Sequence, residues 1–338
     1  MGSQNAFCPG GNSTICNCSY NMTSWEQTMD HLYTYFYLII FIPGLLGNSL
    51  ALWVLCRFIS RKKTKAIIFM INLAIADLAH ILSLPLRIYY YFNHTWPFGK
   101  GLCMLCFYLK YLNMYASIAF LVCISIQRCV FLMHPFCAKK WKRRYDVRIS
   151  IALWLVVGFF CSPFIIMRSN SSSNANGSGC FKDLPTRKLS PHLVAPMVAF
   201  GELLGFVIPL TIIIFCSYSI TRSLRQDFPG QQTVSDKHKA LRLVLVCTGV
   251  FLFCFAPYHI NFLFYMMATQ DIITSCPLQL VVMHFHPISL CIASLNCCLN
   301  PLIYYFLTTE FRQQLSRHGS SVLRGRLMSL ESSSSIRE

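Results

Sequence analysis

The chain carries little charge, and especially little negative charge. Only 12% of its 338 residues are charged, with 12 Asp and Glu against 29 Lys and Arg, whereas 55% are hydrophobic. Soluble domains average about 25% charged residues. The composition therefore excludes an ordinary soluble protein, and no segment is long and polar enough to form a soluble catalytic domain.

Sequence motifs of common enzymes are absent as well. The chain has no H-E-x-x-H zinc motif, no G-x-S-x-G nucleophile motif and no phosphate-binding P-loop. His284 and His286 lie two residues apart, and residues with that spacing do not share a helix face. We therefore expect a protein that is not an enzyme, with no cofactor and no metal ion other than the sodium considered below.

Seven long apolar stretches are present instead, each near or above the roughly 20 residues that a helix needs to cross a bilayer. They are Tyr35–Cys56, Ile67–Tyr91, Cys103–Phe131, Ile149–Ile166, Val194–Tyr218, Leu241–Met267 and Leu278–Phe306. Lipid offers no hydrogen bonds to the backbone, so helices are the expected form of each span. The predicted fold is an all-α membrane protein, a seven-transmembrane helix bundle over residues 33–306.

Three shorter segments flank the predicted bundle. Residues 1–32 are expected to form an extracellular, glycosylated tail, and residues 319–338 a disordered, Ser-rich cytoplasmic tail. Between them, residues 307–318 are expected to form an interfacial eighth helix, because Thr308 can cap it and Phe311 and Leu315 share one apolar face. The alternative for this segment is a frayed continuation of the seventh span.

The positive charge fixes the expected orientation. Of the 29 Lys and Arg, 21 fall in Arg57–Lys65, Lys139–Arg148, Arg222–Arg242 and Arg312–Arg337. Such loops stay in the cytoplasm, so the N-terminus is predicted outside and the C-terminus inside the plasma membrane. Most of this charge is expected to contact anionic lipid headgroups, and no nucleic acid is expected as a partner.

The N-terminal segment contains no apolar core of a cleavable signal peptide, so the first span is expected to act as the insertion signal. All glycosylation sequons fall in segments that the charge pattern places outside the cell, which supports the same topology. They begin at Asn12, Asn17, Asn21, Asn93, Asn170 and Asn176.

Cations stand near both ends of the third span. Lys110 and Arg128 are 18 residues apart, which is five helical turns and about 27 Å along the axis. They therefore point the same way, one near each mouth, as suits a protein that binds a ligand outside and reports it inside. The alternative for Lys110 is that it extends to the outer headgroups.

Asp77 lies in the middle of the second span, where an isolated carboxylate must be protonated, paired or bound to a metal ion. Neutral oxygen atoms at a similar depth could complete a sodium site. They belong to Asn113, Ser117, Asn296 and Asn300. A protonated Asp77 in a water-filled hydrogen-bond network is the equal alternative.

The outer half of the bundle is rich in cations and aromatic residues. Arg87, Lys110 and Arg168 have only Glu202 as an intramembrane acid that could match them. Arg binds phosphate and carboxylate groups with two hydrogen bonds, so these cations predict an anionic ligand.

The landmarks together resemble the rhodopsin-like (class A) G-protein-coupled receptors over residues 33–318. The motifs are Gly47-Asn48, Asn72 to Asp77, Trp96-Pro97-Phe98, Cys103, Arg128, Trp154, Cys180, Pro209, Phe251 to Pro257 and Asn300-Pro301-x-x-Tyr304. The resemblance implies a Cys103–Cys180 disulfide and a sodium site that includes Asp77 and Asn300. It also implies a set of activation switches, namely Arg128, Phe251, Phe255, Pro257, Asn300, Pro301 and Tyr304.

Three further segments resemble the purinoceptor-like branch, and in it the group around purinoceptor ten, whose members respond to lysophosphatidylserine. They are 83–90, 106–115 and 256–259. The resemblance implies a lysophospholipid agonist, a Gα protein of the twelve/thirteen class leading to Rho, and regulation by receptor kinases and arrestin. The expected ligand-binding residues are Arg87, Tyr90, Lys110, Tyr111, Arg168, Phe181, Tyr258 and His259. A second disulfide is implied between Cys276 and an N-terminal cysteine, Cys16 or Cys18, of which we take Cys18.

Two other functions remain open from the sequence. A nucleotide-activated purinergic receptor would use the same cationic and aromatic pocket. A transporter or channel is a distant alternative, because no internal repeat or broken helix is evident in the sequence.

The chain departs from the family pattern at the inner arginine. Gln127 stands where the family usually has Asp or Glu, so Arg128 lacks its neighbouring carboxylate. Phe255 replaces the usual Trp below the ligand pocket. We therefore expect a weaker resting-state lock on Arg128 than in related receptors.

Overall fold

The computed structural model describes residues 23–60, 67–169, 180–181, 191–225, 234–270, 272–273 and 275–307. These residues form helices and contain no strand. The elements are α1 (Thr23–Ser60), α2 (Ile67–Asn93), α3 (Gly99–Met133), α4 (Pro135–Lys140), α5 (Arg143–Ser169), α6 (Pro191–Glu202), the π-helix η2 (Leu203–Val207), α7 (Ile208–Arg225), α8 (Val234–Thr269), α9 (Cys276–Ser294) and α10 (Asn296–Leu307).

Seven helical segments of the described chain are long and apolar enough to cross a membrane, which confirms the predicted bundle. They are Gln27–Arg57, Ile67–Asn93, Gly99–Met133, Arg143–Pro163, Ala195–Arg225, Lys237–Thr269 and Cys276–Ile303. The helices extend beyond the predicted spans, most of all α1, which begins twelve residues before Tyr35.

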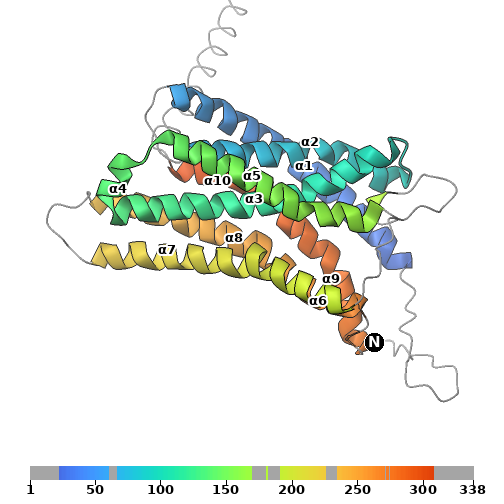
Figure 1. Ribbon diagram of the computed structural model, residues 1–338. Coiled ribbons are helices and arrows are strands. Elements are labelled where there is room, and N and C mark those ends of the chain that lie inside the picture. The colour runs from blue at the N-terminus through green and yellow to red at the C-terminus, as the bar shows by residue number, and fades with distance from the viewer. Residues whose placement is uncertain are drawn as a thin grey trace, which may run out of the picture.

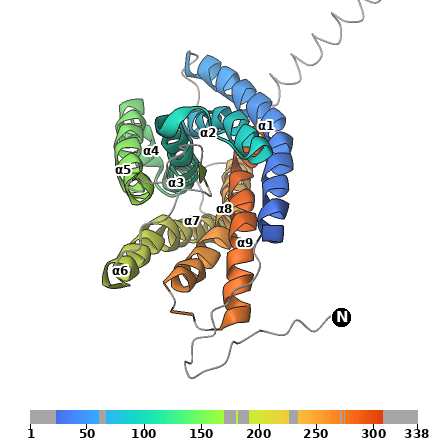
Figure 2. The same ribbon diagram turned by 90° about the vertical axis from the view of Figure 1, so that its right-hand side faces the viewer.

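The central helix of the bundle is α3. It packs against α2, α5, α7 and α8, and the short helix α4 also lies against it. Figure 1 shows α4 at one end of the bundle, opposite the loop that joins α2 to α3. Figure 2 looks along the bundle from that loop and shows α5 and α6 on the side of the bundle away from α1. We call the end that carries the loop between α2 and α3 the disulfide end, after the disulfide described below, and the opposite end the α4 end.

Two of the predicted spans are not single helices. The fifth is α6 and α7 joined by η2, and the wider π-turn falls just before Pro209. Within η2, Gly205 allows the ring of Tyr115 to approach, since a Cβ atom on Gly205 would lie 2.8 Å from Tyr115 Cε1. The seventh span is α9 and α10, which break at Leu295, where the backbone N–H bonds three residues back to Ile292.

The disulfide end is fixed by a covalent bond and by packed rings. Cys103 at the start of α3 is bonded to Cys180, with Cα atoms 6.0 Å apart. Phe181 follows at once, and its ring centroid lies 5.5 Å from that of Trp96 and 5.2 Å from that of Tyr90. The disulfide therefore holds residues 180–181 over the ends of α2 and α3.

Several predicted features lie outside the described residues. These are the tail up to residue 22, the eighth helix beyond residue 307, and the Ser-rich tail 319–338. Cys276 is disulfide-bonded, but its predicted partner Cys18 is among them. So are five of the sequons: Asn12, Asn17, Asn21, Asn170 and Asn176.

We predict that loss of the Cys103–Cys180 bond prevents delivery of the protein to the cell surface. The bond joins residues 77 positions apart, and in the chain-entropy account a loop of that length contributes about 4–5 kcal/mol to stability. Surface labelling of Cys103→Ser and Cys180→Ser should show the loss. The control is Cys56→Ser, which changes an exposed cysteine that forms no disulfide. Surface levels of both variants equal to the control would contradict the prediction.

Candidate functional site

Arg87 is a cation inside the bundle at the disulfide end. Its side chain, on α2, is 2% exposed, and its Nη2 donates a hydrogen bond to the carbonyl oxygen of Cys106 on α3. The guanidinium carbon lies 4.5 Å from the ring centroid of Phe181. Its Nε has no hydrogen-bond partner. Because a buried unpaired donor is costly, Arg87 has the capacity to bind an acceptor from a ligand.

Lys110 of α3 lies among tyrosines of α1. Its Nζ is 3.5 Å from the hydroxyl oxygen of Tyr37 and 5.7 Å from the ring centroid of Tyr33. Both tyrosines are buried, and their rings stack with centroids 5.6 Å apart. We did not predict this contribution of α1 to the site. The one available signal was the four-residue spacing of two tyrosines around the start of the predicted first span, which places them on one helix face.

The predicted aromatic residues are buried at this end of the bundle. Tyr90, Tyr111, Phe181 and Tyr258 are all at most 7% exposed. The hydroxyl group of Tyr258 has no hydrogen-bond partner, which is a second unsatisfied polar group near the predicted pocket.

His259 is paired with Glu202, the acid that the sequence offered as the partner of the cations. Its Nδ1 lies 3.0 and 3.1 Å from the two carboxylate oxygens of Glu202, while its Nε2 has no partner. Glu202 is the last residue of α6, directly before the π-helix, and it faces His259 of α8. Since this acid binds a histidine, it does not neutralise Arg87. We identified Glu202 from the sequence but did not predict its pairing.

A column of rings leads from His259 toward the middle of the bundle. The His259 ring stacks on Phe206 of η2 with centroids 5.0 Å apart, and Phe206 stacks on Phe251 at 5.7 Å. Phe251 in turn contacts Phe255 edge-to-face at 5.8 Å. The predicted switch residues Phe251 and Phe255 are therefore in direct packing contact with the predicted ligand pocket.

A small pocket of about 10 Å³ is lined by Lys110 and Asn113 of α3. Ser294 of α9 also lines it. Its lining is mostly apolar, and its volume is about that needed for one water molecule.

The predicted ion site is assembled as a buried polar cluster. Asp77 is fully buried, and its Oδ1 and Oδ2 accept hydrogen bonds from the side-chain amides of Asn113 at 2.8 Å and Asn300 at 2.9 Å. Asn296 donates to Ser117 at 3.0 Å and to Asn113 at 3.3 Å. The sequence assigned the two amides that contact Asp77 as oxygen ligands, but here they present nitrogen atoms to the carboxylate.

Two amide oxygens of this cluster, on Asn296 and Asn300, are buried without a hydrogen-bond partner. Together with the carboxylate of Asp77, they are hard oxygen donors of the kind that bind alkali and alkaline-earth cations. The residues present therefore fit a sodium ion, which would supply positive charge beside Asp77.

At the α4 end of the bundle, Arg128 lies near the last residue of α3, Met133. Its neighbour Gln127 is 3% exposed and donates from Nε2 to Oδ1 of Asp146 on α5, at 2.8 Å. Pro257 and Pro301 lie within α8 and α10, near the other predicted switches. The side chains of Arg168 and Tyr304 lie outside the described part of the structure.

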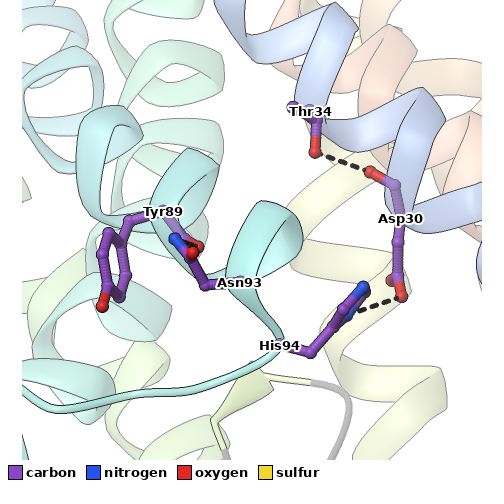
Figure 3. A network of polar contacts seen from close by, with 5 residues as sticks. All are labelled: Asp30, Thr34, Tyr89, Asn93 and His94. Atoms are coloured by element: carbon purple, nitrogen blue, oxygen red, sulfur yellow. Dashed lines mark hydrogen bonds and ion pairs between the residues drawn. The ribbon is translucent and has the colours of Figure 1, made fainter.

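A further polar network joins α1 to the disulfide end of α2 (Figure 3). His94 Nδ1 lies 3.3 Å from Oδ2 of Asp30, and Thr34 donates to the backbone carbonyl of Asp30 at 2.8 Å. Asn93, the one predicted sequon in the described residues, is exposed and donates to the carbonyl of Tyr89 at 3.1 Å. Its exposure leaves the predicted glycosylation sterically feasible.

Comparison with known proteins gives a family and several relatives. The family described as "7 transmembrane receptor (rhodopsin family)" matches residues 47–304. A human protein described as a putative purinoceptor 10 is 57% identical over 330 residues, which cover 98% of this chain and 96% of that protein. The human "Probable G-protein coupled receptor 174" is 51% identical over 286 residues, covering 85% and 86%. The "Lysophosphatidic acid receptor 6" of Mus musculus is 34% identical over 310 residues, covering 91% and 88%.

These matches agree with the seven membrane-crossing helices and with the order of the motifs along them. The chain therefore belongs to the rhodopsin family of seven-transmembrane receptors, in its purinoceptor-like and lysophospholipid-receptor branch, and is a multi-pass plasma-membrane receptor rather than an enzyme.

Proposed function

We propose that this receptor binds an extracellular anionic lysophospholipid, lysophosphatidylserine, at the disulfide end of the bundle. The observation that carries the proposal is Arg87, a buried cation with an unpaired Nε. The acid that could have neutralised it, Glu202, is bound to His259 instead. A phosphate or carboxylate group would satisfy Arg87, and Lys110 would add a second cation.

An apolar surface on α5 and α6, at the side of the bundle away from α1, suits a single acyl chain. Phe160 of α5 and Phe200 of α6 are 46% and 51% exposed, and their ring centroids lie 6.0 Å apart. Apolar surface thus continues from one helix to the next at the lipid-facing side of the bundle. The relatives named lysophosphatidic acid receptors support a lipid ligand for this branch.

The proposed signal passes through the column of rings and ends at Arg128. A ligand that displaces His259 or Tyr258 would shift Phe206 and Phe251, which pack on each other in the middle of the bundle. Such packed interfaces tend to have discrete arrangements rather than to deform continuously. The proposed partner at the α4 end is a heterotrimeric G protein of the twelve/thirteen class, leading to Rho, with receptor kinases and arrestin acting on the Ser-rich tail.

This assignment requires the disulfide end to face outside and the α4 end to face the cytoplasm. The basic residues of the chain support that orientation, because Lys139, Lys140 and Arg143 stand in and after α4. We accordingly propose an extracellular N-terminus and a cytoplasmic C-terminus.

We predict that Lys110→Ala reduces the potency of 1-oleoyl lysophosphatidylserine by roughly ten- to hundredfold, since a hydrogen bond to a charged group contributes on the order of 1.5–3 kcal/mol. Arg87→Lys should have a similar effect, because it keeps the charge but removes the planar guanidinium. The measurement is Gα activation in cells at matched surface expression. Lys100→Ala, an exposed lysine at the same end, serves as the control.

The same assay separates the alternatives. Lysophosphatidic acid and a nucleoside diphosphate are run beside lysophosphatidylserine. If only the nucleotide activates the receptor, and Lys110→Ala loses that response, then the ligand is a nucleotide and not a lipid. Unchanged potency of all three compounds in both variants would contradict an anion site at Arg87 and Lys110.

We also propose that sodium binds at Asp77 and stabilises the resting receptor. A ligand that binds only the folded protein raises stability by about 2.7 kcal/mol at a hundredfold excess over its dissociation constant. The purified receptor should therefore unfold at a higher temperature in sodium chloride than in potassium chloride of equal ionic strength. Asp77→Asn should abolish the difference, whereas the control Asp30→Asn, a buried acid at the disulfide end, should retain it. A difference that persists in Asp77→Asn would exclude this site.

A further inference from the structure

Asp146 links three elements at the α4 end. It stands in the first turn of α5 and is 4% exposed. Its Oδ1 accepts two hydrogen bonds, one from Nε2 of Gln127 at 2.8 Å and one from Nε1 of Trp141 at 2.7 Å. Gln127 belongs to α3, and Trp141 directly follows α4. A single carboxylate oxygen therefore joins α3, the end of α4 and the start of α5.

The contacts suit a negative charge. Hydrogen bonds to an ionised acceptor are roughly twice as strong as those between neutral groups. Asp146 also stands in the first turn of its helix, where the helix dipole favours a carboxylate. Because the group is buried, losing a donor would leave it poorly satisfied.

Trp141 transmits this attachment to α4. Its ring packs edge-to-face on Phe131 of α3 and on Tyr145 of α5, with centroids 5.8 and 5.9 Å apart. Ala138 of α4 is 7% exposed, so one face of the short helix is buried. The opposite side is open, since Phe136 is 80% exposed. A helix of six residues is too short to be stable alone, so its position depends on these contacts.

The exposed side of α4 has the character of a docking surface. Phe136 is a large apolar side chain, and exposed Lys139 and Lys140 follow it on the same short helix. A matching partner would offer an apolar pocket bordered by acidic groups. A surface held in place before binding loses less conformational entropy on binding than a mobile one.

We propose that Asp146 is a positioning residue for G-protein coupling, which holds Gln127 and Trp141 and thereby fixes α4 as a preformed docking surface for a Gα subunit. The inference rests on the proposed coupling at the α4 end. It assigns the carboxylate a different task from that of the acid at position 127 in the family pattern, because Asp146 holds the α4 segment through Gln127 and Trp141.

An exchange of charge between the two positions tests the network without a change of side-chain size. Gln127→Glu alone places a second carboxylate within hydrogen-bond distance of Asp146, and like charges that close repel. In the double variant Gln127→Glu with Asp146→Asn, the new amide at position 146 can donate to the new carboxylate at position 127, and its oxygen can still accept from Trp141. Gln127→Glu alone should therefore leave α4 mobile and weaken coupling, and the double variant should restore both. Trp141→Phe removes one hydrogen bond but keeps the ring.

The first measurement is the mobility of α4, from a spin label on Cys137, an exposed free thiol of that helix. Cys56, the other exposed cysteine of the described residues that forms no disulfide, is changed to serine. Cys137→Ser gives the background signal. We expect a mobile label in Gln127→Glu, intermediate mobility in Trp141→Phe, and wild-type mobility in the double variant. Wild-type mobility in Gln127→Glu, or no rescue in the double variant, would overturn the proposal.

The second measurement is nucleotide exchange on purified G proteins of each Gα class, with 1-oleoyl lysophosphatidylserine as the probe. Exchange should fall about fivefold or more in Gln127→Glu and return to within about twofold of wild type in the double variant, at equal surface delivery. Equal exchange in all variants, despite a mobile label, would overturn the role in coupling. If the wild-type receptor causes no nucleotide exchange, the proposed function is refuted. The mobility of the spin label would then still test whether the Asp146 network holds α4.

Discussion

Hydrocarbon cannot hydrogen-bond to a side chain, and the arrangement of this bundle depends on that constraint. A buried polar group can find a hydrogen-bond partner only within the protein, and several of these partners stand on another helix. Asn48 of α1 donates to the carbonyl of Cys297 on α10 at 2.7 Å, and Trp154 of α5 donates to Asn72 of α2 at 2.8 Å. These bonds set the position of one helix along another, which apolar contacts alone would leave free to slide.

The same constraint explains how much of the fold the sequence predicts. A stretch without charge must be a helix in lipid, so the number of spans follows from composition. The details do not follow, because they depend on neighbours in space. The π-turn before Pro209 accommodates Tyr115 against Gly205, and the break at Leu295 lies next to the polar cluster around Asn296. Neither contact leaves a local mark in the sequence.

The sequence predicted which residues form the candidate site but not which residues they contact. Arg87 and Lys110 were identified because cations in a membrane span are rare, and both do lie at one end of the bundle. Their surroundings involve residues far apart in the chain, such as Tyr37 for Lys110 and Glu202 for His259. A pairing across 57 or 73 positions is a property of the packed bundle. One sequence therefore indicates the chemical groups of a site, whereas the contacts between them require the structure.

The network at the α4 end shows why connectivity matters for function. In the sequence, Gln127 replaces the acid that the family usually has at this position, so we expected Arg128 to be held more weakly in the resting state. In the structure, an acid is present within 2.8 Å of position 127, but it comes from α5. A glutamine can donate to that acid, whereas a carboxylate at the same position would repel it. Gln127 and Asp146 therefore form a matched donor and acceptor pair, and the effect of a substitution at one position depends on the residue at the other. Whatever holds Arg128 at rest, the amide beside it is committed to α5.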